Sequence, residues 1–372
     1  MTGLKLLHTA DVHLGREFRG LGIFGEQMRH ATRDAYERLL QLAKSENVDL
    51  VLVAGDLFDS NEVSKGLVQF AIERAASIAP IPCCILPGTH DCFDRRSVYR
   101  NPEFVHPPDN VKLLVDTEQP HLDFPELDLV VYGKPNLSNR GTMSPLADLQ
   151  RLGERRFHVA MVHGSIAGIG AEDDFPMTRE QISQSEMTYV ALGHWHSWRD
   201  WSSNGVPAIY PGSPESLSFD QDDAGHVALV ELQDGVASVS KTSVGKYRWL
   251  EERVDAATVE SVDDLVERCR GKSDQNALLR VKVTGLAPAG LVLDPDDAAR
   301  RLADDFLYVE LLDQSQLWVD NLPFDKYPET TVIGQFLRLM ERRLQSCETD
   351  DDRRIVEQAT QVGLALLEGK KI

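Results

Sequence analysis

Histidine and aspartate residues gather in five short segments of the 372-residue chain. The segments contain Asp11 and His13, Asp56 and Asp59, His90 and Asp91, His163, and His194 with His196. Each follows an apolar run and adjoins a glycine or a short polar loop. Carboxylates mixed with imidazoles suit divalent cations such as Mn, Fe or Zn. Because no cysteine belongs to the set, a structural zinc site is not indicated. The residue types therefore predict a metal centre.

A single carboxylate can bridge two ions, and a pair of ions about 3.5–4 Å apart can activate a water for in-line attack on phosphorus. The alternative is structural, because a lone histidine or aspartate after a strand is usually packed or solvated. Five such groups in one order favour the metal centre. Its weakest members are Asp59 and Asp91, which also suit a turn or a helix cap.

The elements that must position these residues are short apolar strands alternating with helices. Strands are predicted at residues 4–9, 49–54, 82–86, 111–115, 127–132, 158–163 and 189–193, and helices at 26–45 and 63–78. Shorter β segments follow at 208–210, 226–232 and 237–242. In open α/β sheets, sites assemble at the carboxyl ends of the strands, where these groups lie.

The pattern changes after about residue 250. Helices are predicted at 262–268 and 295–305, and strands at 277–284 and 307–312. Two further helices are expected from residue 331 to the end. We therefore expect a catalytic domain at 1–250, a small α+β domain at 251–328 and C-terminal helices at 329–372.

The overall charge is strongly negative, with 59 acidic and 39 basic residues and a formal net charge of −20. A nucleic-acid binder usually has a basic footprint, so the composition argues against tight autonomous DNA binding. No apolar run approaches the roughly 18 residues that span a bilayer. The N-terminus lacks the pattern of a signal peptide. We expect a cytoplasmic protein with no membrane partner.

Five motifs together carry a resemblance to a known family. They are Asp11-Val12-His13, Gly55-Asp56-Leu57-Phe58-Asp59, Gly88-Thr89-His90-Asp91, Val162-His163-Gly164 and Gly193-His194-Trp195-His196. In this order they resemble the signature of the calcineurin-like metallophosphoesterases. The stretches LLHTADVHLG, VAGDLFD and YPGSPES are similar to the branch of DNA repair exonucleases with SbcD-type and YhaO-type members. The motifs cover about residues 1–220.

The resemblance implies a fold and a set of roles. The fold would be a four-layer α/β/β/α sandwich with a small α+β cap domain, which would bind DNA, and C-terminal helices that would dock a partner. Asp11, His13 and His196 would hold one ion, His163 and His194 the other, and Asp56 would bridge them. His90 would contact the scissile phosphate or donate a proton to the leaving oxygen, and Asp91 would orient His90.

One position departs from the family pattern. Thr89 stands where the family usually has an asparagine whose side-chain oxygen ligates the second metal. A hydroxyl is shorter and a poorer donor. Thr89 would then ligate weakly, a water would take its place, or the second ion would bind with low affinity.

The resemblance implies an enzyme that hydrolyses DNA phosphodiester bonds as an exonuclease or endonuclease in DNA repair. Its cofactors would be two divalent ions, with Mn expected and Fe, Zn or Mg as alternatives. Its partners would be DNA, a coiled-coil ATPase subunit and a second copy of the chain. Two alternatives remain open: a phosphomonoesterase or small-molecule phosphodiesterase on the same scaffold, and a weakly active scaffold subunit of an ATPase complex.

Overall fold

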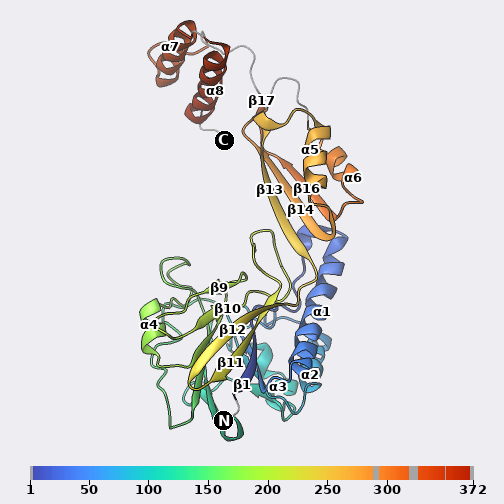
Figure 1. Cartoon of the computed structure of the whole chain (residues 1–372), viewed down its shortest axis with the longest axis vertical. Helices are drawn as coiled ribbons and strands as arrows, with labels where there is room; N and C mark the ends of the chain where they lie inside the picture. The colour runs from blue at the N-terminus through green and yellow to red at the C-terminus, as the bar shows by residue number, and fades with distance from the viewer. Residues whose placement is uncertain (1–2, 288–292, 318–325, 348, 369–372) are drawn as a thin grey trace. The chain divides into compact units, whose positions relative to one another are not determined.

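The computed structural model describes residues 3–287, 293–317, 326–347 and 349–368 (Figure 1). The chain divides into two units, Met1–Arg248 and Trp249–Ile372. The boundary expected at residue 250 falls inside a strand, β13 (Arg248–Asp255). The separate role expected for residues 329–372 stays a prediction.

The first unit contains two six-stranded sheets (Figure 1). The first sheet has the order β12-β11-β1-β2-β3-β4. Its strands are β1 (Leu4–Thr9), β2 (Leu50–Ala54), β3 (Cys83–Leu86), β4 (Val111–Leu113), β11 (His226–Gln233) and β12 (Val236–Ser243). Strands β1 to β4 pair in parallel, and β11 joins β1 in the antiparallel sense. The carboxyl ends of β1 to β3 therefore meet at one edge.

The second sheet has the order β5-β6-β7-β8-β10-β9. Its strands are β5 (His121–Phe124), β6 (Leu129–Tyr132), β7 (Phe157–His163), β8 (Tyr189–Gly193), β9 (Arg199–Asp200) and β10 (Ala208–Tyr210). Strands β6, β7, β8 and β10 are parallel neighbours. The register pairs His163, the last residue of β7, with Gly193, the last residue of β8.

Alternate residues of each strand face different layers, as the two-residue period of a strand requires. One core cluster joins both sheets through their facing sides, with Leu6 and Leu52 from the first sheet and Val159 and Ala191 from the second. The opposite face of the first sheet packs against α1 (Phe24–Ser45) and α2 (Lys65–Ala76). The opposite face of the second sheet contacts α4 (Arg179–Gln184) through Ile182. The layers therefore run α/β/β/α.

The two longer helices follow from spacing and capping. In α1, the buried residues include Met28, Ala31, Ala35 and Leu39, which recur every three or four positions and form one apolar face. The α2 helix begins after Ser64, whose side chain accepts a hydrogen bond from the Leu67 backbone N–H. A short helix, α3 (Pro102–Val105), also packs in this layer through Phe104.

The second unit has a three-stranded sheet of order β13-β14-β16, with β14 (Asp274–Thr284) parallel to β16 (Phe306–Asp313). Helices α5 (Val262–Arg270) and α6 (Pro295–Arg301) contribute apolar residues to its core. A pair of short strands, β15 (Leu286–Ala287) and β17 (Gln316–Leu317), forms a separate ladder. Helices α7 (Val332–Gln345) and α8 (Asp350–Leu367) pack on each other, with the Phe336 ring against Gly363.

The expected α/β class is confirmed. The predicted helices at 26–45 and 63–78 are α1 and α2, with ends shifted by two residues or fewer. Sequence patterns missed β5, β13 and α4. The first and last are too short for a period to emerge, and the β13 sequence RWLEERVD lacks an apolar run. None of the described helices has the length and apolar character needed to cross a membrane.

Candidate metal centre

The predicted site residues follow the carboxyl ends of strands from both sheets. Asp11 and His13 lie after β1, Asp56 after β2 and Thr89 to Asp91 after β3. From the second sheet come His163 at the end of β7 and His194 with His196 after β8. Parallel strands place these loops at a common edge. The fold therefore brings together side chains far apart in sequence, such as His13 and His196, which are 183 residues apart.

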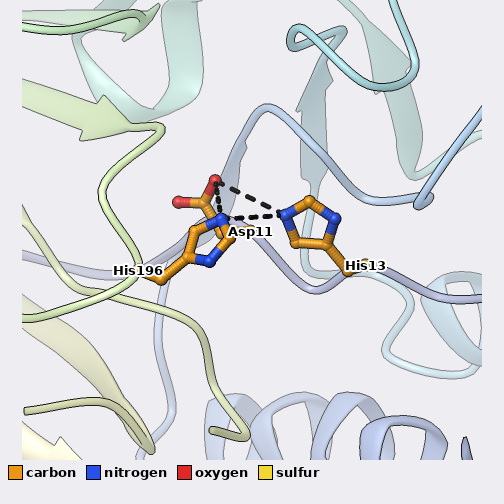
Figure 2. Close-up of side chains that lie close together, drawn as sticks. All are labelled: Asp11, His13 and His196. Carbon is orange, nitrogen blue, oxygen red and sulfur yellow. Dashed lines mark hydrogen bonds and ion pairs between the residues drawn. The ribbon is translucent and has the colours of Figure 1, made fainter. Parts of the chain in front are cut away.

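Among the residues that the structure describes, three groups of side chains have possible ligand atoms within 4.8 Å of one another. They are Asp11 with His13 and His196, His13 with Asp56 and His90, and Asp11 with Asp56 and His163. Figure 2 shows the first group, in which both imidazoles point toward the Asp11 carboxylate. Asp11 Oδ1 lies 3.8 Å from His196 Nε2 and 4.0 Å from His13 Nε2. These distances leave room for a cation between the donors.

Asp56 lies between the two sides of the cluster. Its Oδ2 is 3.3 Å from His163 Nε2 and 3.8 Å from His13 Nε2. The Thr89 hydroxyl donates to the same oxygen at 3.2 Å and lies 3.3 Å from His163 Nε2. The other carboxylate oxygen accepts the backbone N–H of His90 at 2.8 Å. Asp56 therefore lies against His13, predicted to hold one ion, and against His163, predicted to hold the other.

The backbone near these ligands adopts costly conformations. Asp11, His13, Asp56 and His194 all have positive φ, between 51° and 119°. Such conformations are uncommon outside glycine and concentrate at functional sites. At Gly88, a Cβ would lie 2.2 Å from Asp56 Oδ1, so only glycine lets this loop approach the carboxylate.

Burial shapes the protonation of the cluster. Burial opposes ionisation of Asp56, but His163, His13 and His90 together outweigh it and hold the Asp56 pKa well below its usual range. For His163, burial opposes protonation, but the charges of Asp56 and Asp11 and the hydrogen bonds of the ring together raise its pKa to about 10. Burial raises the pKa of Asp11, because His163 compensates its charge only in part. Protonated imidazoles thus balance buried carboxylates, a role that a bound cation would take over with release of protons.

The environment of one buried atom, Asp11 Oδ1, shows whether these residues fit a cation. Asp11 Oδ1 is fully buried and accepts no hydrogen bond from the described residues. A buried acceptor without a partner is costly. Two imidazole nitrogens lie within 4.0 Å of this oxygen, and the Asp56 carboxylate belongs to a second group that includes Asp11. The donor set of carboxylates and imidazoles therefore fits a divalent cation.

Each predicted histidine ligand is held from its other nitrogen. His13 Nδ1 lies 3.1 Å from Asp59 Oδ1, His163 Nδ1 lies 2.9 Å from the Ala54 carbonyl oxygen and His196 Nδ1 lies 2.5 Å from the Gln221 side-chain amide. His194 instead uses Nε2, which is 2.7 Å from Asp174 Oδ2. Outer partners of this kind orient metal-binding histidines.

His90 and Asp91 occupy different environments. His90 is exposed, and its Nδ1 bonds to the Asp59 carbonyl oxygen at 3.0 Å. Asp91 is buried, and its carboxylate accepts from Gly88 N, Phe58 N and Tyr99 Oη. Burial raises the Asp91 pKa to about 6. The described contacts therefore place Asp59, rather than Asp91, against the His90 ring, and Asp91 joins the loops after β2 and β3.

His194 is the one predicted histidine ligand outside the three groups, although its ring lies 5.3 Å from that of His163 and its backbone N–H donates to Asp11 Oδ2. Sequence reasoning missed two residues that contact the cluster, Asp174 and Gln221. Both lie in polar loops without a motif, so only the structure relates them to the site.

Comparisons with known proteins show which chains are similar to this one. The model of the family described as calcineurin-like phosphoesterase matches residues 4–198. The chain is 25% identical over 322 residues to the uncharacterized metallophosphoesterase YhaO of Bacillus subtilis, covering 82% of this chain and 77% of YhaO.

Two further relatives have names that refer to nucleic acids. The DNA double-strand break repair protein Mre11 of Sulfurisphaera tokodaii is 22% identical over 288 residues, covering 74% of this chain and 71% of the relative. One component of the nuclease SbcCD of Staphylococcus epidermidis is 31% identical over 247 residues, covering 59% of this chain and 63% of the relative.

Proposed function

The chain belongs to the calcineurin-like phosphoesterase family, and from this premise we propose that it hydrolyses DNA phosphodiester bonds as an exonuclease or endonuclease in DNA repair. Family membership supports a metal-dependent phosphoesterase, and the names of the Mre11 and SbcCD relatives support DNA as substrate. The observation that carries the proposal is the convergence of Asp11, Asp56 and the surrounding imidazoles on one buried centre.

We assign the donors of two divalent ions, with Mn as the expected metal. Asp11, His13 and His196 would hold the first ion and His163, His194 and Thr89 the second, with Asp56 shared. The orphaned Asp11 Oδ1 supports the first position, and the contacts of Asp56 with His163 and Thr89 support the second. When bound, such a pair would neutralise phosphate charge and activate a water.

His90 is the group placed to handle a proton. Because its Nδ1 bonds to the Asp59 carbonyl oxygen, Nδ1 carries hydrogen and Nε2 remains for the substrate. A protonated His90 would donate from Nε2 to the leaving oxygen or stabilise charge on the phosphate. Asp91 would act indirectly. It accepts hydrogen bonds from the backbone N–H groups of Gly88 and Phe58 and would thereby fix the loops that contain His90 and Asp56.

The remaining regions would supply substrate and partner surfaces. We propose that residues 251–328 form a capping, DNA-binding part and that α7 and α8 dock a coiled-coil ATPase subunit. Both helices carry large exposed apolar side chains, namely Val332, Leu339, Ile355 and Leu366. A homodimer and a cytoplasmic location stay predictions.

A nuclease assay tests the proposal. The full chain with added Mn²⁺ should cleave labelled single- or double-stranded DNA, and His90→Ala should slow cleavage about 10²-fold or more while binding the same number of ions. Failure to cleave either DNA, with or without an ATPase partner, would contradict it. Rapid turnover of p-nitrophenyl phosphate without DNA cleavage would indicate a phosphomonoesterase. One bound ion at most, and no hydrolysis, would indicate a scaffold subunit.

A further inference from the structure

His194 is held differently from the other three predicted histidine ligands. Those three are held through Nδ1, by Asp59, by the Ala54 carbonyl or by the Gln221 amide. His194 is held through Nε2, and its partner is Asp174 at 2.7 Å. The side chains of this pair are only 20% and 25% exposed. The nitrogen left to the centre is therefore Nδ1.

The loop between β7 and α4 is built so that Asp174 reaches His194. The Ser165 N–H donates to the Asp174 carbonyl oxygen at 2.9 Å, and the Met177 N–H donates back to Ser165 O at 2.8 Å. The loop closes tightly at Gly170, where a Cβ would lie 2.0 Å from Ser165 Oγ and 3.2 Å from Asp174 Oδ2. Backbone contacts therefore fix the Asp174 carboxylate beside the centre.

We propose that Asp174 is a positioning residue for the second cation, an inference that rests on the proposed two-ion function. Asp174 accepts the Nε2 hydrogen of His194, so the ring presents its Nδ1 lone pair. The His194 backbone is fixed as well, since its N–H donates to Asp11 Oδ2 at 3.0 Å. The ring lies edge-on to that of His163, the other histidine assigned to this ion, at 5.3 Å.

The chemistry of the second position makes this support important. Thr89 offers only a hydroxyl, which already donates to Asp56. Besides the shared Asp56, His194 and His163 must therefore supply much of the ligand strength. A carboxylate partner raises the basicity of a ligating imidazole. The outward nitrogen of His163, Nδ1, bonds to a backbone carbonyl, so Asp174 is the carboxylate that supports a histidine of this side from its outer nitrogen.

Asp173 provides a matched control one residue away. Its carboxylate pairs with Arg140 at 3.0 Å, and its side chain is 41% exposed. Asp173→Ala removes the same charge from the same loop without removing the partner of His194. A general effect of loop charge would appear in both variants, whereas positioning of His194 would appear only at Asp174.

Mn²⁺ titration of the full chain by calorimetry, with metal content measured after dialysis, tests the inference. Wild type should bind two ions, Asp174→Ala should bind the second 10- to 100-fold more weakly with the first unchanged, and Asp173→Ala should match wild type. Asp174→Asn, which keeps an acceptor oxygen but loses the charge, should give an intermediate loss and guards against a folding defect in the alanine variant.

The outcomes separate this inference from the proposed function. The role of Asp174 would be overturned, with the two-ion centre left intact, by either of two results. In the first, wild type binds two ions and Asp174→Ala binds them equally well. In the second, Asp173→Ala and Asp174→Ala lose the same affinity for the second ion. Fewer than two ions in wild type would overturn both the centre and the inference. The melting temperature of the cation-free variants reports folding independently of hydrolysis.

Discussion

The two units of the chain differ in where they bury charge: among the described residues, buried Asp, Glu and His side chains lie in the first unit and not in the second. In the first unit, Asp11, His13, Asp56 and His163 have side chains no more than 1% exposed. In the second unit, charged side chains pair at the surface, as in the Arg353–Glu357 pair of α8, which is 63% and 35% exposed. Burying charge is costly unless it is compensated, whereas surface pairs change stability little. The first unit therefore accepts a cost that a cation would offset, and the second does not.

The largest expected effect comes from removing the shared carboxylate. Asp56→Asn should lower phosphoesterase activity at least about 10³-fold, because it removes a charged group in contact with both ion positions. Rates of DNA or phosphodiester hydrolysis measure this, and Glu357→Gln in the second unit should leave them unchanged. If the Asp56→Asn rate stayed within tenfold of wild type, the buried charge of the first unit would not be needed for hydrolysis.

Cation removal should affect the two units unequally. At about 1,000 times the dissociation constant, a bound ion adds about 4 kcal/mol of stability. Hydrogen exchange with Mn²⁺ and with a chelator should show lost protection in the loops after β1, β2 and β3, and unchanged protection in β14. Equal loss in both units would show that the cation effect is not local.

A third test concerns a buried acid away from the cluster. Glu215 accepts from Lys246 N and Tyr247 N and pairs with Arg38, yet burial raises its pKa to about 7. Because this pKa exceeds the unfolded value of 4.5, the stabilising contribution is complete below pH 4.5 and is lost as the pH rises through 7.

The measurement is the unfolding free energy of wild type minus that of Glu215→Gln. It should fall by about 1.4 kcal/mol per pH unit between pH 4.5 and 7, on the order of 3 kcal/mol in total, and stay flat above. If this free-energy difference did not vary across the pH range, burial of Glu215 would not oppose its ionisation.

A smaller effect is expected at the position that departs from the family pattern. Thr89→Asn should raise the affinity for the second ion roughly tenfold, because a carboxamide oxygen reaches farther and is a stronger donor than a hydroxyl. Mn²⁺ titration measures this, with Thr89→Ser as the variant that keeps the hydroxyl. Identical affinities for Asn and Thr would mean that position 89 does not limit the second ion.

The smallest effect should come from the second unit. Arg353→Ala removes the exposed pair with Glu357, four residues apart in α8, and should cost no more than about 0.5 kcal/mol. Urea denaturation of this variant and of Glu357→Ala measures it. A loss above 2 kcal/mol would contradict the contrast between surface and buried charge.

Much of the first unit could be predicted because its strands are apolar runs in the sequence and its site residues come at the ends of those runs. The strands at β1, β2, β3, β7 and β8 are apolar runs, and the site residues follow them directly. Partners set by tertiary contact could not be predicted. Asp174 reaches the site only when its loop folds against His194, in the loop after β8, and the bonds of Asp91 to Phe58 and Tyr99 depend on how two loops pack. The spacing of residues in the sequence predicts neither the contact of Asp174 with His194 nor the bonds of Asp91.

The separation of Asp11 and His13 from His194 and His196 has a consequence for synthesis of the chain. Partners 183 residues apart, on different sheets, meet only after both sheets have formed. A nascent chain emerging from the ribosome thus lacks the complete donor set until β8 and the loop beyond it are available. Ion capture would accordingly be a late event of biogenesis, so that an unfinished polypeptide would not acquire hydrolytic capacity before its scaffold is assembled.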